Sequence, residues 1–217
     1  MDLLNFKAAI FDLDGTLVES EPAWLHAKAE YARSEGIVLP AGALERYIGR
    51  RLSDFVGDYP GSRVSDRGRA EAIARIETLA EAAMPDMEKP MPGAASLARF
   101  CGVSGLRLAV CSSAPLRFIS AALERLEIAD LFEVSVSAAE MAQGKPHPAP
   151  YLKTLDHLGI AASKTVAFED SWPGARSASD AGVFTIAVGP GCTGETFTFC
   201  DARFESAGEV IASLETG

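Results

Sequence analysis

The sequence contains few of the residues that build disulfide frameworks or zinc sites. It has four cysteines and three histidines among 217 residues. The cysteines lack C-x-x-C spacing and the histidines lack metal-ligand spacing, so we expect reduced thiols in a cytoplasmic protein and no zinc site. These residues are Cys101, Cys111, Cys192, Cys200, His26, His147 and His157.

Clusters of positive charge and long apolar runs are also missing. The chain has 20 basic and 30 acidic residues, a net charge of −10, and no Lys/Arg cluster of the size that binds nucleic acid or anionic lipid. No apolar run reaches the length of a transmembrane helix. Residues 1–17 carry charges within a strand-like pattern, unlike a signal or transit peptide. We therefore expect neither nucleic acid nor a membrane as a partner.

Short apolar, β-prone runs alternate with helical patterns along most of the chain. With 48% hydrophobic residues, a chain of this length can bury a substantial core. The alternation predicts an α/β fold with a Rossmann-like, doubly wound parallel sheet. The runs are Lys7–Phe11, Arg107–Cys111, Glu133–Val136, Thr165–Phe168 and Val183–Val188, and the segment from Ala202 is expected to add a short strand and a helix.

About a hundred residues separate the first two predicted strands, far more than one crossover needs. Helical patterns cover Glu21–Gly36, Ala41–Ile48 and Ser65–Met84, while Tyr59–Gly68 is polar enough to form a mobile loop. Prolines at 85, 90 and 92 mark the return to the core. We therefore predict a helical cap at residues 18–86, inserted into a core formed by residues 1–17 and 87–217.

Two carboxylates lie at the end of the first predicted strand. Asp12 and Asp14 are two residues apart, so in an extended segment their side chains face the same side. Such a pair normally needs a hard cation or a cationic side chain between its members. A solvated turn is the simpler alternative. A calcium loop starting at Asp12 is excluded, because its sixth and twelfth positions would be Leu17 and Ala23.

Polar residues follow three further predicted strands, where ligands bind in open parallel sheets. Each could have a local role alone: Ser112 as a helix cap, Lys145 as an exposed lysine, Glu169 at a capped helix start. Their occurrence in order at strand ends predicts a joint phosphate and metal site. The residues are Ser112, Ser113, Lys145, Glu169 and Asp170.

This set of residues suits phosphoryl transfer. Asp12 can attack phosphorus to form an aspartyl-phosphate, and Asp14 can protonate the leaving oxygen and then activate water. Mg²⁺, Lys145 and the Ser112 hydroxyl would neutralise charge on the transferring group, and Asp170 would complete the metal site.

The motif D-x-D-G-T, the serine after the second core strand, the lysine before proline and the final acidic pair resemble the haloacid dehalogenase superfamily. The segment A-F-E-D-S-W-P-G-A-R-S-A-S-D-A-G is similar to its β-phosphoglucomutase-like branch, although Ser177, Ser179 and Ala149 depart from the pattern. The resemblance implies a Rossmann-like core, a helical C1 cap and Mg²⁺. It implies metal binding by Asp12, the Asp14 main-chain carbonyl and Asp170, with Glu169 at the metal or behind it, and adds Thr16 to the phosphate-binding candidates Ser112, Ser113 and Lys145.

The resemblance leaves more than one reaction open. Trp24 aligns with a histidine that performs acid–base work in β-phosphoglucomutases, and Pro115 and Leu116 replace residues that bind a second phosphate there. We therefore favour a Mg²⁺-dependent phosphatase acting on a sugar phosphate or sugar-acid phosphate, as a monomer or weak homodimer. A phosphosugar mutase, a phosphoglycolate phosphatase and a module that only binds phosphate are the alternatives.

Substrate specificity is expected to come from cleft-facing residues of the cap. Arg50 or Arg51 could hold a carboxylate or hydroxyl groups by bidentate hydrogen bonds, or both could be solvated on a cap helix. The specificity candidates are Glu19, Ser20, Trp24, Gly49, Arg50 and Arg51.

Overall fold

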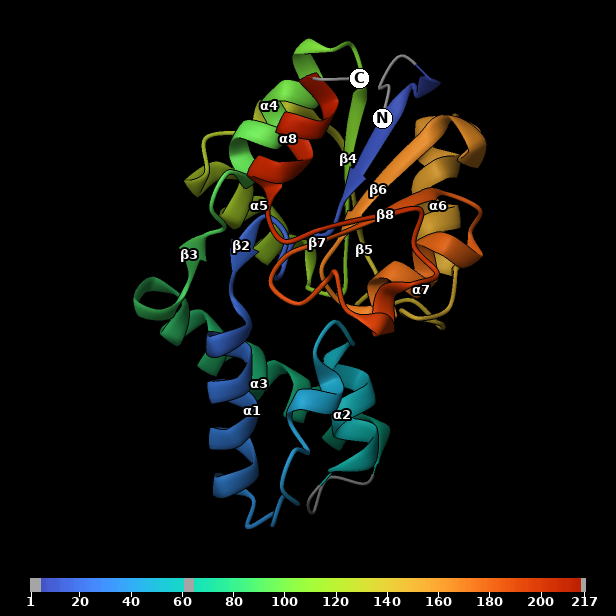
Figure 1. The fold of residues 1–217 in the computed structure, drawn as a ribbon. Helices are drawn as coiled ribbons and strands as arrows, with labels where there is room; N and C mark the ends of the chain where they lie inside the picture. Colours follow the sequence, from blue (N-terminus) through green and yellow to red (C-terminus); the bar gives the residue numbers. More distant parts are fainter. Residues whose placement is uncertain (1–4, 61–64, 216–217) are drawn as a thin grey trace.

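The structure, a computed structural model, describes residues 5–60 and 65–215. Six parallel strands form one sheet in the order β5-β4-β1-β6-β7-β8 (Figure 1). This order confirms the predicted doubly wound sheet, including the strand expected from Ala202. The strands are β1 (Ala8–Phe11), β4 (Arg107–Ser112), β5 (Phe132–Ser137), β6 (Thr165–Glu169), β7 (Phe184–Val188) and β8 (Ala202–Phe204).

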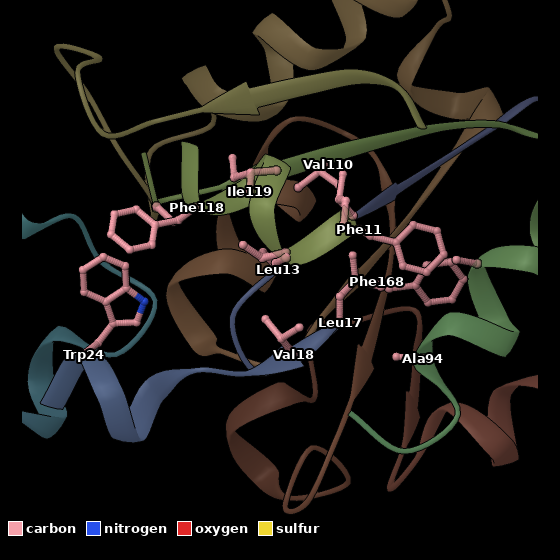
Figure 2. Packing of buried hydrophobic residues seen from close by; sticks show 14 of the residues in the cluster. Phe11, Leu13, Leu17, Val18, Trp24, Ala94, Val110, Phe118, Ile119 and Phe168 are labelled. Carbon is pink, nitrogen blue, oxygen red and sulfur yellow. The ribbon is translucent and has the colours of Figure 1, made fainter. Parts of the chain in front are cut away.

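Helices cover both faces of the sheet, and β1 is therefore buried on both sides. Ala9 and Phe11 pack in a cluster with helices α4 (Ala94–Val103), α5 (Leu116–Arg125) and α8 (Ala207–Glu215). Ala8 and Ile10 pack in another with α6 (Ala149–Leu158) and α7 (Trp172–Asp180). Figure 2 shows Phe11 beside Phe168, with ring centroids 4.7 Å apart. Full burial on both faces explains why β1 reads as a continuous apolar run.

Three helices lie beyond the carboxyl ends of the strands: α1 (Glu21–Ser34), α2 (Leu52–Asp58) and α3 (Asp66–Met87) (Figure 1). Helices α1 and α3 pack through mostly small side chains that are fully buried, which lets their backbones approach closely. These side chains are Ala23, Ala27, Tyr31, Ala72, Ile76 and Ala80. Helix α3 begins where the Ser65 hydroxyl accepts a hydrogen bond from the Gly68 N–H, at 3.1 Å.

The helix predicted at Ala41–Ile48 is wrong. That segment forms turns and a short 3₁₀ helix at Glu45–Tyr47, because non-helical backbone limits it at both ends: Gly42 has φ of 71° and Ile48 is extended, with ψ of 130°. The unpredicted α2 follows it. Helix α3 also continues past Met84 to Met87, with Pro85 in its last turn. The predicted mobile loop Tyr59–Gly68 lies partly outside the described residues, and its end belongs to α3.

The chain enters and leaves the three-helix part at adjacent points. Strand β2 (Val18–Glu19) pairs antiparallel with β3 (Lys89–Pro90), and the Met91 N–H donates to the Leu17 carbonyl at 3.0 Å. The proposed boundaries between core and cap lie beside this two-stranded ribbon. Among the helices of the described chain, none is long and apolar enough to cross a membrane.

Candidate active site

Asp12, directly after β1, is held by a buried lysine. The Lys145 ammonium donates to Asp12 Oδ1 at 2.5 Å, to Glu169 Oε1 at 2.6 Å and to the Cys111 carbonyl at 2.9 Å. Lys145 comes from the loop after β5 and is 2% exposed. The simple reading of Lys145 as a surface lysine is therefore wrong, and the lysine joins the ends of β1, β4 and β6.

Glu169, the last residue of β6, is fully buried behind Asp12. Its Oε1 also accepts from the Tyr151 hydroxyl at 2.6 Å, while its Oε2 has no hydrogen-bond partner among the described residues. A Cβ atom at Gly174, in the first turn of α7, would lie 1.9 Å from that Oε2. No local pattern in the sequence marks Tyr151, whose contact with Glu169 depends on α6 packing over the sheet.

Negative charge exceeds positive charge in this cluster. Burial, followed by the charge of Glu169, raises the pKa of Asp12 well above its usual value, and burial also raises the pKa of Glu169. Burial and Glu169 raise the pKa of Asp170 to about 8. Burial alone would lower the pKa of Lys145, but Asp12 and Glu169 outweigh it and raise that pKa. The cluster therefore favours an additional cation.

The same carboxylates could hold a metal ion. Asp12, Glu169 and Asp170 each place one oxygen within 4.8 Å of the others. Carboxylate oxygens are the ligands that Mg²⁺ prefers, and the unpartnered Glu169 Oε2 adds to the charge that needs neutralising. The donor set thus fits a hard divalent cation.

Asp14 lies in the turn after β1, where three side chains donate to its carboxylate. The Trp24 indole N–H donates to Oδ1 at 3.0 Å, the Ser112 hydroxyl donates to Oδ2 at 3.1 Å, and the Ser20 hydroxyl also donates to Oδ1. Figure 2 shows Trp24 beside Phe118, with ring centroids 4.9 Å apart and ring planes inclined by 57°. Ser112 does not cap a helix, since α5 begins at Leu116 after Pro115.

The Asp12–Thr16 turn is shaped around Asp170. Gly15 has φ of 86°, and a Cβ atom there would lie 2.0 Å from Asp170 Oδ2. Only glycine fits this close approach without moving the aspartate. The buried Thr16 hydroxyl donates to Asp170 Oδ1 at 3.5 Å, so Thr16 contacts a metal-site candidate.

A small pocket of about 30 Å³ opens beside Asp12 and Asp14. Three of the specificity candidates line it: Trp24, Gly49 and Arg50. Sequence reasoning missed Glu21, Lys28 and Tyr47, which also line it. The spacing of Glu21 and Lys28 from Trp24 places all three on one face of α1, and this was the available signal.

The remaining candidates occupy other positions. Glu19 is exposed in β2 and Ser20 contacts Asp14. Arg51 pairs with Asp54 at 2.6 Å and donates to the Met141 carbonyl, and it lines a neighbouring cleft. The Ser113 hydroxyl donates to the Gly49 carbonyl at 3.0 Å. Arg51 and Ser113 thus join the three-helix part to the core.

Replacing Gly174 with alanine tests the packing against Glu169. We expect Gly174→Ala to lower the free energy of unfolding by about 1–3 kcal/mol, because the new methyl group must displace a carboxylate bonded to Lys145 and Tyr151. Gly57→Ala is the matched control, since that exposed helical glycine has open space around it and should gain about 0.5–1 kcal/mol. Urea unfolding measures both, and equal stability of the two variants would contradict the packing argument.

Comparison with known families agrees with this arrangement. The family model of the haloacid dehalogenase-like hydrolases matches residues 6–182. The chain belongs to this family. It is therefore an enzyme, and its resemblance to the β-phosphoglucomutase-like and sugar phosphatase branch of the superfamily is confirmed.

Several relatives of this haloacid dehalogenase-like hydrolase are phosphatases. Hexitol phosphatase B of Escherichia coli is 30% identical over 210 residues, 94% of each chain. Phosphoglycolate phosphatase of Rhodospirillum rubrum is 32% identical over 197 residues, covering 87% of this hydrolase and 82% of the relative. The crystal structure of β-phosphoglucomutase from Clostridium difficile has a TM-score of 0.83 at 20% identity and covers 97% of both chains. The last similarity concerns the fold alone.

Proposed function

We propose that this hydrolase is a Mg²⁺-dependent phosphatase that cleaves a small phosphorylated metabolite, a sugar phosphate or sugar-acid phosphate, through an aspartyl-phosphate. The contact between Lys145 and Asp12 carries the proposal, because it fixes a buried carboxylate at the edge of a pocket that Asp14 also lines. The named phosphatase relatives support the same reaction class.

The reaction proceeds in two steps on Asp12. A carboxylate oxygen of Asp12 attacks phosphorus, the ester P–O bond breaks, and Asp14 gives its proton to the leaving oxygen. Water then attacks the aspartyl-phosphate and transfers a proton to Asp14, which releases phosphate and restores Asp12. Lys145 orients Asp12, and its charge with the Ser112 hydroxyl stabilises the phosphoryl oxygens.

Mg²⁺ would be held by Asp12, Asp170 and the Asp14 main-chain carbonyl, and it would neutralise charge on the transferring phosphoryl group. Glu169 would stand behind them, since its Oε1 already accepts from Lys145 and Tyr151. Thr16, Ser113 and the backbone after β4 are the further phosphate-binding candidates.

The mutase alternative is disfavoured by the position of Trp24. Its indole N–H donates to Asp14, and an indole cannot exchange protons at neutral pH as an imidazole can. We further propose that the enzyme acts in the cytoplasm as a monomer or weak homodimer, without nucleic-acid or membrane partners, which its net charge of −10 supports.

Magnesium should both activate and stabilise the protein. We expect phosphate release from an aryl phosphate only with Mg²⁺, and a gain of about 2.7 kcal/mol in the free energy of unfolding at 100 times the dissociation constant. Malachite-green assays and urea unfolding with Mg²⁺ or EDTA measure the two effects. Asp170→Asn should remove most of both, whereas undiminished phosphate release in EDTA would refute the metal-dependent mechanism.

A further inference from the structure

Lys28 is a buried cation whose position the proposed chemistry does not explain. It lies on α1, is 3% exposed and lines the pocket that contains Asp12 and Asp14. Within the described residues its ammonium group contacts one side chain, Glu21, at 3.4 Å. An ammonium group has three N–H donors, so this one has donors to spare.

Glu21 also lines this pocket, so its carboxylate acceptor lies beside the Lys28 ammonium donor. Its side chain is 20% exposed, and burial raises its pKa to about 7 against the opposing effect of Lys28. The pair lines the same pocket as Asp14, the group that would protonate the leaving oxygen, and Asp14 also raises the pKa of Glu21. The ionised pair has no net charge, and its 3.4 Å separation is long for a strong ion pair.

We propose that Lys28 and Glu21 bind hydroxyl groups of the leaving group, and that the substrate is a phosphate ester of a neutral polyol or sugar. This inference rests on the proposed phosphatase function. A hydroxyl both donates and accepts, so adjacent hydroxyls can accept from the Lys28 ammonium and donate to the Glu21 carboxylate. Because Glu21 and Lys28 are two turns apart on α1, the pair is held by a single rigid element.

The same pair disfavours a leaving group that carries its own negative charge. A carboxylate, as in phosphoglycolate, or a second phosphate would gain from Lys28 but would be repelled by the ionised Glu21 carboxylate. Arg50 also lines the pocket, but it is exposed and its charge is screened. We therefore expect the enzyme to prefer polyol and sugar phosphates over phosphoglycolate and sugar bisphosphates.

The pocket also limits how much of the leaving group these residues contact. Its volume of about 30 Å³ is only about that of two water molecules, so a sugar phosphate must extend beyond it. A cleft of about 850 Å³ adjoins it and shares Leu52, Ser113 and Pro115 with it. The remainder of a larger polyol can extend in that direction.

The test compares substrates and variants of the full chain with Mg²⁺. We expect kcat/KM for a hexitol phosphate to exceed that for phosphoglycolate and for a hexose bisphosphate. In Lys28→Met, the ratio of kcat/KM for hexitol phosphate to that for an aryl phosphate should fall about tenfold or more, the contribution of a hydrogen bond to a charged group. In Glu21→Gln, phosphoglycolate should gain about tenfold relative to hexitol phosphate. Lys7→Met, at an exposed position before β1, is the control.

Binding provides a readout that needs no turnover. Calorimetry of the Asp12→Asn protein with hexitol phosphate should show about tenfold weaker binding when Lys28→Met is added. The inference would be overturned if both variants kept the wild-type selectivity and binding, or if the wild type preferred phosphoglycolate. The proposed function would still stand in that case, provided that the wild type hydrolyses the aryl phosphate. If Lys28→Met weakened binding but the wild-type protein hydrolysed no phosphate ester, the inference would be supported and the phosphatase function refuted.

Discussion

Asp12→Asn is expected to lower kcat for every phosphate ester by about 10⁴-fold or more, because an amide cannot form the aspartyl-phosphate. The variant should nevertheless fold. Asp12 and Glu169 share the Lys145 ammonium group and Asp170 lies beside them, so replacing Asp12 with a neutral amide removes repulsion between buried charges. We therefore expect the free energy of unfolding without metal to stay the same or increase.

Paired measurements distinguish a chemical role from a structural one. Phosphate release gives kcat, and urea unfolding in EDTA gives the stability of the same preparation. Asp156→Asn is the matched control, since Asp156 is exposed on α6. Substantial hydrolysis by Asp12→Asn would show that another group attacks phosphorus, and the mechanism would then be wrong.

Lys145→Met should cause the largest loss of stability. Removal of the ammonium group leaves Asp12 and Glu169 as buried carboxylates without their shared counter-charge, which typically costs about 3–5 kcal/mol. It also frees the Cys111 carbonyl from its hydrogen bond with Lys145. Activity should be lost as well, because Asp12 is no longer oriented.

Magnesium shows whether Lys145→Met is unstable because the counter-charge is lost or because packing is lost. A divalent cation can neutralise the same carboxylates, so Mg²⁺ should stabilise Lys145→Met more than it stabilises the wild type. Lys7→Met should leave the unfolding free energy nearly unchanged, since that lysine is exposed. If Lys145→Met unfolded at the wild-type urea concentration in EDTA, the lysine would not be the counter-charge of this cluster.

The parts of the fold that could be predicted from the sequence are those that show up in the pattern of neighbouring residues. Strands buried on both faces, such as β1 and β6, are short apolar runs whatever their neighbours, and parallel strands bring the residues after them to one edge. Asp12, Lys145 and Glu169 were therefore predicted to lie together from their positions after strands, and they do.

The features that were missed depend on packing between distant segments. Tyr151 reaches Glu169 only because α6 covers the sheet, and nothing within α6 marks that hydroxyl. Helix α2 has seven residues and few periodic positions, so its pattern is weak. The apolar positions of Ala41–Ile48 resemble those of a helix, although they lie in turns and a 3₁₀ helix where Ala43 and Tyr47 are buried. Lys28 was overlooked because a lysine on a helix is usually exposed.

The ribbon formed by β2 and β3 has a consequence for how such enzymes diversify. Val18 pairs with Pro90, so the two ends of the segment that carries α1, α2 and α3 are neighbouring strands. Paired strands lie about 4.8 Å apart, so a replacement segment of any length needs only two adjacent ends to be joined to the same core. Exchanging this segment between relatives would transfer Trp24 and Lys28 together while Asp12, Lys145 and Glu169 stay in place. Under the proposed function, recombination at this ribbon would change the residues that contact the leaving group without changing those that attack phosphorus.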